Sequence, residues 1–134
     1  MDKLFIEAKT ENLDTVMDFV NERIAHCSMK IQNQIGIVVD EVFANIAEYA
    51  YNPKGGDVTV EIKVGDSIVI SFEDSGIEYN PLTAEAPDIT AGVDERELGG
   101  LGIFMVKNIM DLVEYKREGD KNILTIQKQI GGNQ

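Results

Sequence analysis

Residues 40–51 read DEVFANIAEYAY, and this stretch decides how the chain folds. It is the second half of a helical pattern that begins near residue 30. At about 100° per residue, one face of that helix is an apolar arc made of Ile35, Val39, Val42, Ile46 and Tyr49. Glu41, Asn45 and Glu48 form a polar stripe beside the arc. Such a stripe can place a general base and a metal ligand on one face, or it can be an ordinary solvated surface.

Two other stretches carry chemistry at the ends of predicted elements. Asp74-Ser75-Gly76 follows a β-rich run, so its carboxylate can accept a hydrogen bond from a nucleobase amino group. Ordinary turn chemistry would give the same residues. Gly99-Gly100-Leu101-Gly102 opens a helix, where backbone N–H groups and the helix dipole favour phosphate, although a flexible hinge is the alternative. No Gly-Lys-Ser/Thr follows, which excludes a Walker A loop.

The remaining pattern predicts one domain, residues 1–134, with the order β-α-α-β-β-loop-α-β-β. The expected elements are a strand at 4–9, helices from 10–12 to about 24 and 30–51, strands at 58–64 and 68–72, a loop at 75–98, a helix at 101–112, and strands at 113–117 and 122–128. This order predicts an α+β fold, a two-layer α/β sandwich with helices on one face of a mostly antiparallel mixed sheet. A loop of this length is often a lid over a functional site.

Composition narrows the class of partner. The chain has 134 residues, a net charge of −12 and one cysteine. The excess of acid argues against nucleic acid and anionic membranes as partners, and it requires a metal ion and local donors wherever ATP binds. No apolar run approaches the roughly 18 residues that span a bilayer. With no disulfide framework and no signal-peptide pattern, we expect a cytoplasmic protein.

Taken together, these stretches resemble a known superfamily, the gyrase, heat-shock chaperone, histidine kinase and mismatch-repair ATPases, which share the Bergerat ATP-binding fold. Residues 40–51 are similar to its N-box, Asp74 to Gly76 to its Asp-x-Gly box, and residues 99–102 to its second glycine box. Residues 96–103, 110–115 and 122–125 further resemble the anti-sigma regulatory factor branch, which consists of small serine/threonine protein kinases.

The resemblance implies roles for particular residues. Glu41 corresponds to the general base, and Asn45 to the ligand of the Mg²⁺ on the ATP phosphates. Asp74 corresponds to the adenine-binding carboxylate, with Gly76 allowing the base to approach. Arg96 corresponds to a lid cation near the γ-phosphate, and Thr125 to a hydroxyl near the adenine. The implied phosphate loop consists of Gly99, Gly100, Leu101 and Gly102.

The resemblance also implies a function. It indicates an ATP-dependent serine/threonine kinase that phosphorylates a small anti-sigma-factor antagonist, binds a sigma factor and forms a homodimer. Two alternatives stay open: a nucleotide-gated interaction module without transfer activity, and a plain ATP hydrolase. A histidine-kinase catalytic domain is disfavoured, because such domains usually lack a Glu at position 41 and need a further domain for the acceptor histidine.

Overall fold

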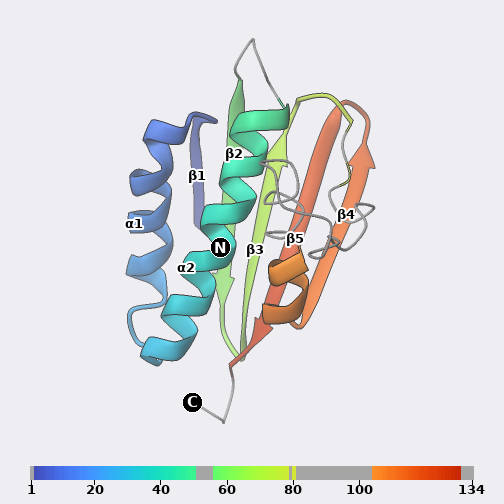
Figure 1. Cartoon of the computed structure of the whole chain (residues 1–134). Coiled ribbons are helices and arrows are strands. Elements are labelled where there is room, and N and C mark those ends of the chain that lie inside the picture. The colour runs from blue at the N-terminus through green and yellow to red at the C-terminus, as the bar shows by residue number, and fades with distance from the viewer. Residues whose placement is uncertain (1, 51–55, 79, 81–103, 131–134) are drawn as a thin grey trace, which may run out of the picture.

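The computed structural model describes residues 2–50, 56–78, 80 and 104–130. In these ranges the chain forms five strands and several helices (Figure 1). In chain order they are β1 (Asp2–Glu7), a 3-10 turn (Thr10–Asn12), α1 (Leu13–Arg23), α2 (Met29–Asn45), a π-helical turn (Ile46–Ala50), β2 (Asp57–Val64), β3 (Ser67–Asp74), a helix at 104–109, β4 (Leu112–Glu118) and β5 (Lys121–Gln129).

The strands form one sheet in the order β1-β2-β3-β5-β4. All pairings among the described strands are antiparallel, so the expectation of a mostly antiparallel sheet is confirmed, and no parallel pair is found among them. The β4–β5 hairpin turns at Gly119, whose φ of 63° lies in the left-handed region that glycine adopts without steric cost.

The helices cover one face of this sheet, as predicted (Figure 1). The core lies between the two layers and follows the hydrophobic pattern of the sequence. On β2 and β3 every second side chain is buried, and on α2 the buried side chains recur at helical spacing. These residues are Val58, Val60, Ile62, Ile68, Ile70 and Phe72 on the strands, and Ile35, Val38, Val39, Val42 and Phe43 on the helix.

Two predicted helix ends differ from the structure. The helical pattern predicted over 30–51 is present, but from Ile46 it continues as a π-helical turn, which a 3.6-residue period does not foresee. The predicted helix at 101–112 ends at Ile109, because the ammonium group of Lys128 donates to the Ile109 carbonyl at 2.8 Å and Leu112 already begins β4. The predicted C-terminal end was therefore wrong.

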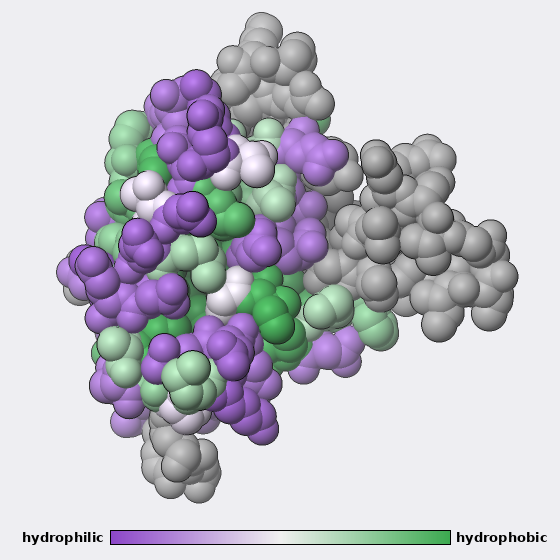
Figure 2. All heavy atoms as spheres, turned by 60° about the vertical axis from the view of Figure 1, so that its left-hand side comes forward, coloured by the Kyte–Doolittle hydropathy of each residue, from purple (hydrophilic) through white to green (hydrophobic). Residues whose placement is uncertain are grey.

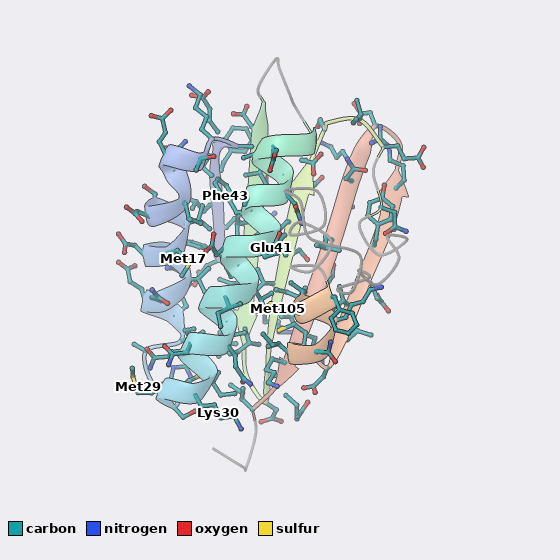
Figure 3. All side chains as sticks on the ribbon, in the orientation of Figure 1. Met17, Met29, Lys30, Glu41, Phe43 and Met105 are labelled. Carbon is teal, nitrogen blue, oxygen red and sulfur yellow. The ribbon has the colours of Figure 1, made fainter. Side chains whose placement is uncertain are left out.

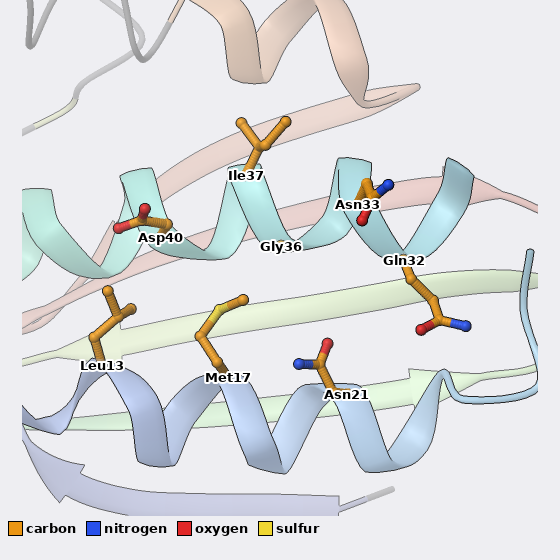
Figure 4. Close-up of a pocket in the computed structure, with 8 residues that line it drawn as sticks. All are labelled: Leu13, Met17, Asn21, Gln32, Asn33, Gly36, Ile37 and Asp40. Atoms are coloured by element: carbon orange, nitrogen blue, oxygen red, sulfur yellow. The ribbon is translucent and has the colours of Figure 1, made fainter. Parts of the chain in front are cut away.

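The outer surfaces of α1 and α2 are mostly polar, with small separate hydrophobic patches (Figure 2). A groove runs between the two helices (Figure 4), lined by Leu13, Met17, Asn21, Gln32, Asn33, Gly36, Ile37 and Asp40. The helices approach closely at Gly36, where an added Cβ would lie 3.2 Å from Cε of Met17. Among the described residues, no helix has the length and hydropathy needed to cross a membrane.

Candidate functional site

Asp74 and Asn122 face each other at one end of the sheet. Asp74 is the last residue of β3 and pairs in register with Asn122 near the start of β5. Both residues continue the inward-facing phase of their strands, after Phe72 on β3 and before Leu124 on β5. Their side chains are therefore buried, each with 5% of its surface exposed. The sheet thus holds a carboxylate and an amide at the edge of its hydrophobic core.

The Asp74 carboxylate is hydrogen-bonded within the protein. The Gly76 backbone N–H and the Asn122 side-chain amide both donate to its Oδ1, each at 2.9 Å. A buried carboxylate is costly unless such donors compensate it. The Asp-Ser-Gly stretch therefore forms a turn, which was one of the two interpretations of the sequence. That turn also fixes one oxygen of a buried carboxylate.

Asn122 is the centre of a wider network. Its amide nitrogen also donates to the Ile77 carbonyl at 2.7 Å. Its carbonyl oxygen accepts from the Tyr115 hydroxyl at 2.5 Å and from the Arg117 guanidinium at 3.2 Å. The same Arg117 nitrogen donates to the Gly76 carbonyl at 2.9 Å. The β4–β5 hairpin therefore supports the segment that follows β3.

The second part of the site is the polar stripe of α2. Glu41 lies on the side of this helix that faces away from α1 (Figure 3), and Asn45 follows one turn later on the same face. The amide nitrogen of Asn45 and the side-chain oxygen of Gln34 are buried and have no hydrogen-bond partner among the described residues. A buried polar atom without a partner costs about 1–3 kcal/mol. This face of α2 is therefore not satisfied by the protein's own described groups.

Glu41 is electrostatically perturbed. Burial raises the pKa of its carboxyl above the ordinary value, and the neighbouring carboxylates of Asp40 and Glu48 raise it further. A higher pKa makes the ionised carboxylate a better proton acceptor near neutral pH. The environment of Glu41 is therefore suited to a general base.

The two parts of the site lie at the same end of the sheet. The π-helical turn that extends α2 ends at Ala50, and β2 begins at Asp57, so the start of β2 follows closely on the end of the helix. Val58 on β2 pairs with Asp74 on β3. The Asn45 end of α2 and the Asp74 end of β3 are therefore on the same side of the molecule, as the two ribbons in Figure 1 show.

Thr125 is not part of this arrangement. It pairs in register with Ser71, and the two hydroxyl oxygens lie 3.2 Å apart. Ser71 and Thr125 have the opposite phase to Asp74 and Asn122, and alternate side chains of a strand point to opposite faces of the sheet. The side chain of Thr125 is therefore on the face that the helices leave open, and its predicted contact with the adenine stays a prediction.

The residue that sequence reasoning missed is Asn122. Its signal was the alternation of β5, in which Leu124 and Ile126 point into the core and Asn122 occupies the next position in the same phase. A polar side chain in an inward phase at a strand end indicates a buried hydrogen-bonding role.

The other predicted contacts fall outside the described residues. They are Arg96, Gly99, Gly100, Leu101 and Gly102, together with most of the loop predicted as a lid. Their roles stay predictions. In the part of the chain that is described, no group of three or more His, Cys, Asp or Glu side chains is arranged to hold a metal ion.

The described residues form an α+β domain with helices on one face of an antiparallel sheet. Residues 6–128 match the histidine kinase-like ATPase domain family, and the chain belongs to that family.

Two curated relatives illustrate the range of similarity. The serine/threonine-protein kinase BtrW of Bordetella bronchiseptica is 24% identical over 102 residues, which cover 74% of this chain and 71% of the relative. The serine-protein kinase RsbW of Bacillus mycoides is 25% identical over 93 residues, which cover 66% of this chain and only 58% of the relative.

Two solved structures share the fold. The histidine kinase domain of the Erythrobacter litoralis EL346 blue-light activated histidine kinase has a TM-score of 0.56 at 17% identity, covering 90% of this chain and 60% of that one. The Acinetobacter baumannii histidine kinase AdeS has a TM-score of 0.56 at 14% identity, covering 97% of this chain and 68% of that one. At such identities the likeness shows the fold alone.

Proposed function

We propose that the protein binds Mg·ATP and transfers the γ-phosphoryl group to a serine or threonine of a small anti-sigma-factor antagonist. The observation that carries the proposal is Glu41, a partly buried carboxylate with a raised pKa, one turn before Asn45 on the same helical face. One curated relative is named as a serine/threonine-protein kinase and another as a serine-protein kinase, which supports a hydroxyl acceptor over histidine.

The adenine of ATP would be recognised at the end of β3. Asp74 has one carboxylate oxygen that accepts from Gly76 and Asn122, and in this proposal its second oxygen accepts from the adenine 6-amino group. Gly76 allows the base to approach the backbone. A charge-assisted hydrogen bond of this kind contributes about 1.5–3 kcal/mol.

The metal would be held mainly by the phosphates. Mg²⁺ prefers oxygen ligands and often takes only one or two from the protein, which agrees with the lack of an acidic cluster among the described residues. The side-chain oxygen of Asn45 would be the protein ligand of the ion, and its buried amide nitrogen, which no described group engages, would be a donor for the nucleotide phosphates. When bound, the ion would neutralise charge on the phosphates; Gly99, Gly100, Leu101, Gly102 and Arg96 would contribute backbone and side-chain donors there.

In the transfer step the serine oxygen attacks the γ-phosphorus while the bond to the β–γ bridging oxygen breaks, and ADP leaves. Glu41 accepts the proton of the serine hydroxyl. The protein contributes mainly by positioning and by neutralising charge, because this type of transition state needs little covalent help. We further propose cytoplasmic function, homodimerisation and binding of a sigma factor, from the resemblance of the sequence to the anti-sigma regulatory factor branch.

The test is to follow the phosphate of γ-labelled ATP with a co-encoded candidate antagonist present. The proposal expects label on one serine or threonine of the antagonist, at a rate well above its release into water, because a docked hydroxyl has a high effective concentration. The matched control is the antagonist with that serine replaced by alanine. Nucleotide-dependent binding without label transfer would favour an interaction module, and release of free phosphate alone would favour a hydrolase.

A further inference from the structure

The orientation of the Asn122 amide is favoured by four described groups around it. Its nitrogen lies within hydrogen-bond distance of two groups that only accept, the Asp74 carboxylate and the Ile77 carbonyl. Its oxygen lies beside two donors, Tyr115 and Arg117. Turning the amide over would place oxygen against oxygen and nitrogen against donors, so one orientation is strongly preferred.

This orientation fixes Asp74 in turn. Both donors to Asp74, the Gly76 N–H and the Asn122 amide, use Oδ1 at 2.9 Å. Rotating the carboxylate would break both hydrogen bonds at once in a buried place, where an unpaired polar group is costly. Oδ1 is thereby committed to the protein, and Oδ2 is the oxygen that remains to accept from a ligand.

Arg117 links the two residues that donate to Asp74. Arg117 donates to the Asn122 oxygen and to the Gly76 carbonyl, so one guanidinium holds both residues that hold Asp74. Hydrogen bonds that share members in a poorly hydrated site reinforce one another. The β4–β5 hairpin therefore acts as a support for the strand end at Asp74.

We propose that Asn122 is a positioning residue that sets base specificity, by holding the Asp74 carboxylate so that Oδ2 accepts from a 6-amino group. The proposal rests on the proposed nucleotide binding, which it deepens. A purine with a hydrogen-bond donor at position 6 is the ligand chemistry that such an acceptor selects. Asn122 itself need not touch the base.

The experiment compares ATP with its 6-deamino analogue, purine riboside 5′-triphosphate, by calorimetry. The wild-type chain should bind ATP about tenfold or more tightly than the analogue, because only ATP can form the charge-assisted hydrogen bond to Asp74. In Asn122→Ala this preference should fall to about threefold or less, mainly through loss of ATP affinity. The matched control is Ser71→Ala, which removes a hydrogen bond from the same strand on the opposite face and should keep the wild-type preference.

A milder variant keeps the test decisive if Asn122→Ala does not fold. Tyr115→Phe removes one donor to Asn122 and leaves the ring in place, so it should lower the preference partially and in the same direction. If Asn122→Ala or Tyr115→Phe weakened both ligands equally, Asn122 would be merely structural and the inference would be overturned while nucleotide binding stood. If the wild-type chain bound neither triphosphate, the proposed function would fail, and this inference with it.

Discussion

The Asp74 end of β3 and the Glu41 face of α2 treat their polar groups in opposite ways. At Asp74 the buried carboxylate is held by two donors from the protein, and the amide that supplies one of them is itself held from both sides. On α2, the amide nitrogen of Asn45 has no partner among the described residues, and Glu41 sits close to two other acids. We call the Asp74 end of β3 the finished region, because its buried polar groups are paired within the protein. We call the Glu41 face of α2 the unfinished region, because a buried polar atom there has no partner among the described residues.

The difference indicates which region is suited to ligand recognition and which to catalysis. A recognition group gains from being fixed before the ligand arrives, since little order is then lost on binding. A group that must accept a proton or meet a metal and phosphates gains from a setting that disfavours its resting charged state. The finished region therefore suits selection of the base, and the unfinished region suits chemistry.

The largest expected effect concerns the unfinished region. Glu41→Gln keeps the shape of the side chain but removes the proton acceptor, so phosphoryl transfer should fall by about 10²–10⁴-fold. ATP affinity should change little, because Glu41 acts on the acceptor hydroxyl. Single-turnover transfer and equilibrium titration measure the two quantities separately.

Asp40→Asn is the matched control for Glu41→Gln. It removes the neighbouring carboxylate, which is exposed and lines the groove towards α1 (Figure 4). Its transfer rate should stay within a few-fold of wild type. Equal rates for wild type and Glu41→Gln would show that the contrast between the two regions does not extend to catalysis.

The next effect tests the finished region through Asp74→Asn. Because the Gly76 N–H and the Asn122 amide both need an oxygen, the new amide should turn its oxygen towards them and its nitrogen towards the ligand. ATP affinity should fall at least about tenfold, since two donors then face each other. Inosine triphosphate, which has an acceptor at position 6, should lose much less.

Glu73→Gln is the control on the same strand, because Glu73 points to the opposite face and contacts Lys121 at 3.8 Å. It should leave the ratio of ATP to inosine triphosphate affinity unchanged. If Asp74→Asn also left that ratio unchanged, the base would be recognised elsewhere.

How far the sequence predicts this contrast depends on the kind of signal. The α2 stripe was predictable because helical spacing alone places Glu41 and Asn45 on one face, and the structure places them there. Asp74 was predictable as a strand-end acid. The roles of these residues in binding and catalysis stay predictions.

Pairing across strands was harder to predict. Thr125 was assigned to the site from its place in a strand that resembles a family pattern, but its phase places it on the other face of the sheet. A one-residue difference in phase decides the face, and the sequence does not state which strand β5 pairs with or in which register. The partnership of Asn122 and Asp74, 48 residues apart, depends on that register.

A smaller effect follows from the phase of Thr125 on β5. Thr125→Val removes the hydroxyl that contacts Ser71 on the open face of the sheet. ATP affinity should stay within about twofold of wild type, while unfolding free energy should fall by about 0.5–1.5 kcal/mol, the usual contribution of one hydrogen bond. Calorimetry and urea unfolding measure the two. A tenfold loss of ATP affinity would return Thr125 to the site and contradict the observed phase.

The smallest expected effect is a gain in stability from the residue whose loss harms catalysis most. Burial and the charges of Asp40 and Glu48 raise the pKa of Glu41 above its ordinary value of 4.5, so the folded protein holds this proton more tightly than the unfolded chain. The stability linked to that proton is fully present below the ordinary pKa and is lost as the pH rises through the folded-state pKa. Glu41→Gln is neutral throughout. Without ligand at pH 7, the variant should therefore unfold at a higher urea concentration than wild type. Its free energy of unfolding should be higher by less than about 1 kcal/mol because the site is partly solvated, and this difference should shrink as the pH falls towards 4.5.

Glu11→Gln, which removes the same unit of charge from an exposed position, is the control for general repulsion in this acidic chain. If both variants gained equally, Glu41 would carry no strain of its own, and the α2 face would be as finished as the Asp74 end.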